Sequence, residues 1–174
     1  TIAPVYDSHS RILILGTMPS PKSREAGFYY GHPQNRFWRV LSQVLQQPLP
    51  ETLSEKRELL LNNRIALWDV LAECRIQGAS DASIADAVPN DIPRILREAP
   101  IQAVFTTGAA AEKLYRRLIY PLTGVDCIRL IAPCAWSSWW RPIARSCPFS
   151  GREDGLTQPC KAEAKLSLYT RNCT

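Results

Sequence analysis

The sequence predicts an α/β fold in three layers, in which helices cover both faces of a central, four-stranded, mainly parallel sheet. Four apolar runs of strand length carry this prediction, at residues 12–15, 65–70, 103–107 and 127–132. Helical patterns and turn signals separate these runs, and such alternation is typical of parallel sheets. With 174 residues, of which 45% are hydrophobic, the chain is long enough for one domain with a substantial core.

The first predicted strand leads into a loop that gathers polar and aromatic residues. Gly16 ends the apolar run and allows a sharp turn. Two prolines follow, then the aromatic residues 28–30 and the segment His32-Pro33-Gln34-Asn35. The loop lies between the C-terminal end of a strand and the N-terminal end of a helix, where open α/β sheets bind ligands. We therefore expect the functional site in this loop.

Several segments carry helical signals. Apolar residues repeat at helical spacing from Phe37 to Leu45, and Asn35 is in a position to cap this helix. Pro48 cannot continue the helical hydrogen bonding, so the helix is expected to end before it. The other helices are predicted over residues 53–63, 80–87 and 91–97, and after Gly108.

Composition and charge restrict the location and the class of partner. No apolar run approaches the roughly eighteen residues that cross a membrane, and no charged leader precedes an apolar core at the N-terminus. We therefore expect a cytoplasmic protein with no membrane contact. The net charge of +5 and the pI near 9.0 favour a polyanionic partner. Six Lys/Arg against three Asp/Glu place +3 of this charge in residues 133–174, so the remainder is only mildly basic.

Neither a nucleotide cofactor nor a metal is expected. Gly16 is not followed by the Gly-x-Gly-x-x-Gly pattern of dinucleotide-binding folds, and the chain lacks the Gly-Lys-Ser/Thr of phosphate-binding loops. The six cysteines include no Cys-x-x-Cys and have no histidine pair nearby, which argues against a zinc site. Reduced thiols are the expectation for a cytosolic chain.

The loop reads Gly16-Thr17-Met18-Pro19-Ser20 and continues, after eight residues, with Tyr29-Tyr30-Gly31-His32-Pro33-Gln34-Asn35-Arg36-Phe37-Trp38. These two segments resemble the first active-site motif of the hypoxanthine-DNA glycosylases (DNA-deoxyinosine glycosylases) of the uracil-DNA glycosylase superfamily. The similarity continues through residues 66–70, 87–91 and 104–108, and covers about residues 1–130. It implies a uracil-DNA glycosylase-like α/β domain over residues 1–132.

The resemblance implies a base-excision repair enzyme that hydrolyses the N-glycosidic bond of deaminated bases in damaged DNA, without a cofactor. Hypoxanthine is the implied preferred base, with uracil as a second substrate, and the enzyme is expected to be monofunctional and monomeric. It must extrude the base, which requires an aromatic platform, donors for the leaving base and a positioned water. Two other functions stay open: a catalytically impaired DNA- or nucleobase-binding protein of this fold, and a small-molecule nucleoside enzyme.

Three side chains take implied roles in catalysis and stacking. By motif position, Asn35 is implied to be catalytic through an amide that holds water or the base, and His32 to assist it. Tyr30 is implied to stack on the extruded base, whereas Phe28 and Tyr29 also suit core packing. Each polar role has a structural alternative: Asn35 as a helix cap, and His32 as a loop residue bonded to the backbone.

The start of the loop is implied to bind the base and the DNA. Backbone N–H groups after Gly16, near Thr17 and Met18, are implied to donate to a base carbonyl, and the Met18 side chain cannot orient water. Ser20 is implied to bind a DNA phosphate, with closure of a Pro-Ser-Pro turn as the alternative. Asp69, near the end of the second predicted strand, either makes a cap or loop hydrogen bond or borders the cleft.

The resemblance stops near residue 132. Related glycosylases carry a second motif, a Pro-Ser-Thr-Ser-Pro-like loop, after the fourth strand, and residues 132–138 do not align with it. Residues 133–174 lack sustained periodicity and are interpreted as a divergent or frame-shifted tail, not a separate domain. We therefore expect weak activity from this chain, and more from a chimera whose tail carries that loop.

Overall fold

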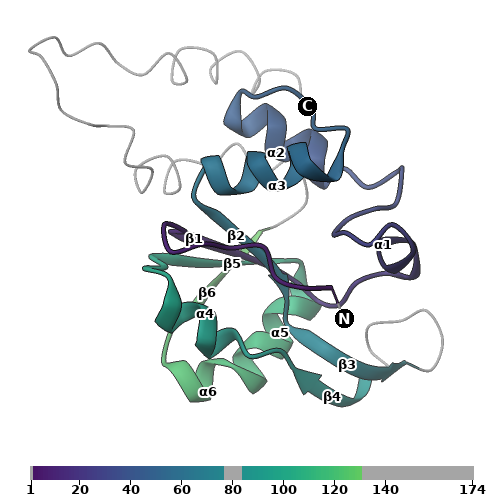
Figure 1. Cartoon of the computed structure of the whole chain (residues 1–174). Helices are drawn as coiled ribbons and strands as arrows, with labels where there is room; N and C mark the ends of the chain where they lie inside the picture. The colour runs from purple at the N-terminus through teal and green to yellow at the C-terminus, as the bar shows by residue number, and fades with distance from the viewer. Residues whose placement is uncertain (1, 77–83, 131–174) are drawn as a thin grey trace, which may run out of the picture.

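A parallel sheet of four strands forms the centre of the protein (Figure 1). The computed structural model describes residues 2–76 and 84–130. The sheet has the strand order β2-β1-β5-β6, and all neighbouring strands are parallel. Its strands are β1 (Ile12–Gly16), β2 (Ile65–Asp69), β5 (Ala103–Thr107) and β6 (Cys127–Leu130). The four predicted strands are confirmed, while residues 131–132 and the interpreted tail lie outside the described residues.

Helices cover both faces of this sheet, as predicted (Figure 1). Because successive side chains of a strand point to opposite faces, Ile12 and Ile14 join one buried cluster and Leu13 and Leu15 join another. The first cluster packs under α2 (Phe37–Leu45) and α3 (Leu53–Asn62). The second packs against α4 (Ile92–Glu98), α5 (Ala109–Leu118) and the segment before α6 (Tyr120–Thr123).

Local capping sets the helix boundaries. Thr52 and Glu55 form a reciprocal capping box at the start of α3, and the Asp91 side chain accepts from the Arg94 N–H to cap α4. The helices predicted over 37–47, 53–63 and 91–97, and after Gly108, are confirmed within two residues at their ends. A short helix that was not predicted, α1 (Pro21–Glu25), lies inside the loop after β1.

The helix predicted over residues 80–87 is wrong where the structure describes it. Residues Ile84–Pro89 form strand β4, which pairs antiparallel with β3 (Leu71–Ile76), and residues 77–83 lie outside the description. The alanines of this segment favour a helix, but β3 continues the chain directly beyond β2 and offers β4 a backbone partner. Strand pairing therefore overrides local propensity here.

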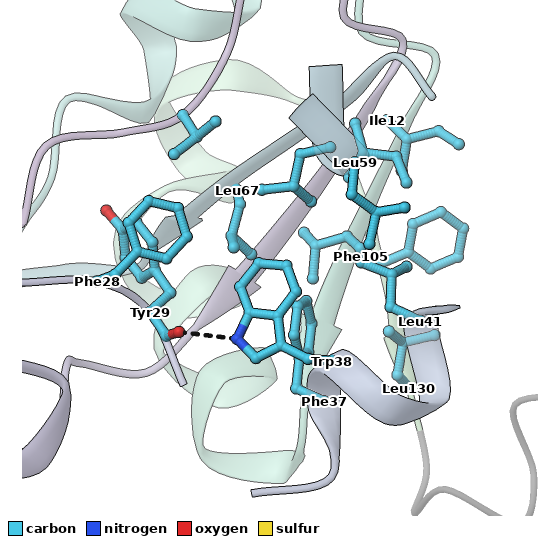
Figure 2. Packing of buried hydrophobic residues seen from close by; sticks show 14 residues of the cluster. Ile12, Phe28, Tyr29, Phe37, Trp38, Leu41, Leu59, Leu67, Phe105 and Leu130 are labelled. Carbon is cyan, nitrogen blue, oxygen red and sulfur yellow. Dashed lines mark hydrogen bonds between the residues drawn. The ribbon is translucent and has the colours of Figure 1, made fainter. Parts of the chain in front are cut away.

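Aromatic residues attach the loop after β1 to the α2 face of the sheet (Figure 2). Phe28 and Trp38 stack with their ring centroids 5.9 Å apart, and Trp38 Nε1 donates to the Tyr29 carbonyl oxygen at 3.1 Å. Both Phe28 and Tyr29 are buried, and the Tyr29 hydroxyl donates to the backbone oxygens of Ile2 and Ala3. Phe28 and Tyr29 therefore pack in the core, as expected.

Candidate active site

Three residues end adjacent strands at one edge of the sheet and lie on the same face. Gly16 of β1 pairs in register with Asp69 of β2, and Thr107 ends β5 on the other side of β1. Two positions before each of these residues, the same strand carries a member of the buried cluster under α2 and α3. Because side chains of a strand alternate between the two faces of a sheet, all three residues lie on the face toward those helices. We call Asp69, Gly16 and Thr107 the strand-end row.

Tyr30 lies over the strand-end row. Its hydroxyl shares a hydrogen bond of 2.9 Å with Thr107 Oγ1, which itself donates to the Leu15 carbonyl oxygen at 3.3 Å. Its ring stacks on Phe37, with centroids 3.9 Å apart and planes 15° apart. Burial and, to a smaller extent, Asp69 raise the pKa of the Tyr30 phenol well above its usual value, so it is neutral.

The Tyr30 backbone has a left-handed conformation, with φ of 53°. This region is costly for a residue with a bulky side chain, and such strain concentrates at functional sites. The strained backbone turns the ring inward from the loop, where Phe37 supports it and Thr107 holds its hydroxyl.

Gly16 leaves room for the groups on either side of it. An ideal Cβ at this position would lie 2.2 Å from Asp69 Oδ1 and 3.1 Å from the Tyr30 hydroxyl oxygen. No side chain fits between them, so the space requirement alone accounts for glycine at residue 16. The same geometry brings the Asp69 carboxyl and the Tyr30 phenol together over one point of the strand-end row.

Asp69 is buried, with 4% of its surface exposed. Burial raises the pKa of its carboxyl from 3.8 to about 7. Among the described residues, Oδ2 has no hydrogen-bond partner. The Asn90 side chain donates to the Asp69 carbonyl oxygen at 2.8 Å, which holds the backbone of this residue in place. The structure therefore gives no support to the interpretation of Asp69 as a capping residue, since its buried Oδ2 has no partner among the described residues.

A model of the uracil DNA glycosylase superfamily matches residues 3–152 of the chain. The chain belongs to this superfamily. Two curated relatives, from Methanosarcina acetivorans and Methanosarcina barkeri, are both named hypoxanthine DNA glycosylase and are 37% and 38% identical over 97 and 98 residues. These alignments cover 55% and 56% of this chain and 61% and 62% of the relatives, so the chain spans less than two thirds of their length.

A solved structure supports the superfamily fold. The solution structure of a candidate uracil DNA glycosylase from Methanosarcina acetivorans is similar to this chain, with a TM-score of 0.67 and 27% identity. The similarity covers 83% of this chain and 94% of that one. The superfamily match extends past residue 132, and so includes part of the segment interpreted as a tail.

In this member of the uracil DNA glycosylase superfamily, the other predicted residues lie along the loop rather than over the strand-end row. The Asn35 side chain is exposed, and its Oδ1 accepts from the N–H of Phe37, the first residue of α2, at 2.9 Å, whereas the N-cap residue of α2 is Arg36. His32 is also exposed, and its Nδ1 accepts from the Gln34 N–H at 3.1 Å. Ser20 caps α1, accepting from the Ser23 N–H at 3.2 Å.

The two residues after Gly16 connect the loop to the strand-end row. Thr17 accepts from the Leu71 N–H through its carbonyl oxygen, which fixes the backbone where the base is expected to bind. Met18 is partly buried and packs against the cluster that includes α4 and α5. Its side chain therefore packs against the core.

Sequence reasoning missed Thr107 and Phe37 as parts of this site. Thr107 ends a predicted strand just before Gly108, so the common edge of parallel strands was an available signal for it. Phe37 was assigned only to the apolar face of a helix.

In the part of the chain that the structure describes, no group of three or more His, Cys, Asp or Glu could hold a metal ion. Over the same residues, no helix is long and apolar enough to cross a membrane.

Proposed function

We propose that this chain is a monofunctional DNA glycosylase that removes hypoxanthine from deoxyinosine in DNA, with uracil as a slower substrate and damaged DNA as its partner. The observation that carries the proposal is the stacked pair of Tyr30 and Phe37, held over the strand-end row by Thr107. The names of the two curated relatives support hypoxanthine as the base. We propose that the enzyme acts as a monomer.

The first step is extrusion of the base from the duplex onto Tyr30. Stacking on an aromatic ring offsets part of the cost of unstacking, by about 1–3 kcal/mol per base. Phe37 supports the Tyr30 ring from behind, and the buried Trp38 and Phe28 support the loop. The platform is therefore rigid, so little further ordering is needed when a base binds.

Hydrolysis then requires a water molecule and donors for the departing base. Water adds its oxygen to C1′, the bond from C1′ to the base nitrogen breaks with its electron pair going to the base, and the proton lost by water ends on the base. Backbone N–H groups near Thr17 and Met18 stabilise the charge that develops on the base. A carbonyl oxygen has two lone pairs, and the Phe37 N–H uses one at Asn35 Oδ1. The same amide can therefore keep its bond to the first residue of α2 and hold the water.

An excision assay tests this function. The full chain is incubated with duplexes that contain deoxyinosine, deoxyuridine or neither, and with free deoxyinosine, and alkali-labile sites and released bases are measured. We expect strand breaks at deoxyinosine after alkali, fewer at deoxyuridine and none at deoxyadenosine. Strand breaks without alkali would reject the monofunctional mechanism. Selective binding to deoxyinosine duplex without any base release would favour the binding-protein alternative, and release only from free deoxyinosine the nucleoside enzyme.

A further inference from the structure

The buried carboxyl of Asp69 has no function in the mechanism above. Among the acidic residues whose side chains the structure describes, it is the only one that is buried. A buried polar atom normally has a hydrogen-bond partner, and leaving one without a partner is costly. Asp69 Oδ2 is such an atom, and it lies at the edge of the sheet where this fold binds ligands. A carboxyl kept there at a cost to stability indicates a function in binding or catalysis.

The surroundings of Asp69 favour its neutral form. Burial and, to a smaller extent, Asp69 raise the pKa of the phenols of Tyr29 and Tyr30, so both neighbours are neutral. Gly16 contributes only backbone on the β1 side, and on the β4 side Asn90 is uncharged and uses its amide on the Asp69 backbone. Among the described residues, no cation forms an ion pair with Asp69. Without a positive charge to stabilise the anion, burial favours the protonated acid.

We propose that Asp69 acts as a neutral carboxylic acid that donates a hydrogen bond from Oδ2 to the carbonyl oxygen that deamination creates on the six-membered ring of the base. The proposal rests on the glycosylase function proposed above. It defines the substrate class as bases with a ring carbonyl beside a ring N–H, which hypoxanthine and uracil share. Adenine has an amine in place of that carbonyl. This amine donates hydrogen bonds and does not accept one from Asp69.

The proposal also gives Asp69 a part in bond cleavage. The base gains negative charge as its bond to C1′ breaks, and part of this charge reaches the ring carbonyl oxygen. A preorganised neutral donor stabilises that charge, whereas an ionised carboxylate in a buried site repels it. Excision is therefore expected to slow as pH rises through the range in which Asp69 ionises, which burial places near pH 7.

Access to Asp69 involves Tyr30. The phenol lies above Gly16, close to the Asp69 carboxyl, with its hydroxyl bonded to Thr107. A base stacked on the Tyr30 ring therefore lies beside the Asp69 carboxyl, and its ring carbonyl oxygen accepts the hydrogen bond from Oδ2. The Tyr30 hydroxyl keeps its bond to Thr107 and the ring keeps its contact with Phe37.

Two measurements on the full chain test this role. The first is single-turnover excision from deoxyinosine duplex between pH 5.5 and 9, for the wild type, Asp69→Asn and Asp69→Leu. The Asn variant has the same shape and a permanent N–H donor, and the Leu variant has no polar group. We expect the wild-type rate to fall up to tenfold per pH unit above about pH 7. Asp69→Asn should keep a rate within tenfold of the wild type and lose this decline, and Asp69→Leu should lose at least a hundredfold at pH 6.

The second measurement does not depend on turnover. It compares binding to a duplex whose deoxyinosine carries a 2′-fluorine, which resists hydrolysis, with binding to the deoxyadenosine duplex. Selective binding that weakens in Asp69→Leu and at pH 9 supports the role of Asp69 even if the wild type releases no base, in which case only the glycosylase proposal fails. Excision that proceeds in Asp69→Leu within threefold of the wild type, with no decline above pH 7, overturns the role of Asp69 and leaves the glycosylase proposal intact. Absence of both excision and selective binding overturns both.

Discussion

Asp69 Oδ1 occupies the space that a side chain on Gly16 would fill. The two residues are paired partners on adjacent parallel strands, and an ideal Cβ on Gly16 would be 2.2 Å from that oxygen. This distance is far below any normal contact, and the nearest atoms belong to a buried carboxyl that has little room to move. The identities of residues 16 and 69 therefore depend on each other.

Replacement of Gly16 by alanine tests this dependence. We expect Gly16→Ala to lower the free energy of unfolding by about 1–3 kcal/mol, as overpacking does in cores, and to lower excision because Asp69 shifts. In the Asp69→Ala background the same substitution should cost much less, which denaturant unfolding of the four proteins measures as a coupling energy. Gly27→Ala is the contrasting control, since it meets no atoms within 4 Å but has φ of 65°. The loss of stability in Gly27→Ala comes from the backbone conformation and should be the same in the wild-type and Asp69→Ala backgrounds.

Two substitutions of Tyr30 separate its ring from its hydroxyl. Tyr30→Phe keeps the stack on Phe37 and loses the hydrogen bond to Thr107, so we expect a stability loss of about 0.5–1.5 kcal/mol and a rate within threefold of the wild type. Tyr30→Ala removes the platform and should lower single-turnover excision by about 5–150-fold, the equivalent of one lost base stack. Equal rates in the two variants would show that the ring does not stack on the base.

Asn35 has a structural contact and a proposed catalytic role, and Asn35→Ala removes both. Loss of the bond to the Phe37 N–H should lower the free energy of unfolding by about 1 kcal/mol. Loss of a catalytic amide should lower turnover by a much larger factor than the one to which this energy corresponds. Thr52→Ala, which removes the cap of α3, is the matched control and should cost similar stability with no change in turnover. If both variants lose activity only in proportion to stability, the bond to the first residue of α2 is the whole role of Asn35.

The sequence was informative where a local pattern decides the structure. The apolar runs ending at Gly16 and Thr107 predicted buried strands, and the loop residues that follow Gly16 predicted the position of the site. The strand over Ile84–Pro89 was missed because its pairing with β3 is a tertiary contact, and alanine-rich segments read as helices when such contacts are unknown.

The composition of the site was harder to predict, because it depends on strand register. Asp69 was recognised as a carboxylate near a strand end, but only the parallel pairing of β1 with β2 places it over Gly16. In the same way, the inward turn of Tyr30 depends on a left-handed backbone that residue type does not favour. The resemblance to a family identified loop residues, whereas the strand-end row requires the folded sheet.

The buried acid also predicts an unusual dependence of stability on pH. For Asp69 the folded-state pKa of about 7 lies above the ordinary value of 3.8, so the folded protein holds a proton that the unfolded chain releases between these values. Stability therefore falls as pH rises through this window, by up to about 1.4 kcal/mol per pH unit, and the loss is complete above pH 7.

Asp69→Asn removes this ionisation and should therefore stabilise the protein at pH 8 relative to the wild type, with a much smaller difference at pH 4. Thermal melting at the two pH values measures the effect, and Glu51→Gln, at an exposed acid, controls for the loss of one negative charge. A variant that gains stability at pH 8 while its excision loses pH dependence would show that the wild type keeps a destabilising acid for its chemistry. An equal change in melting temperature at both pH values would instead mean that Asp69 ionises in the folded protein as it does in the unfolded chain.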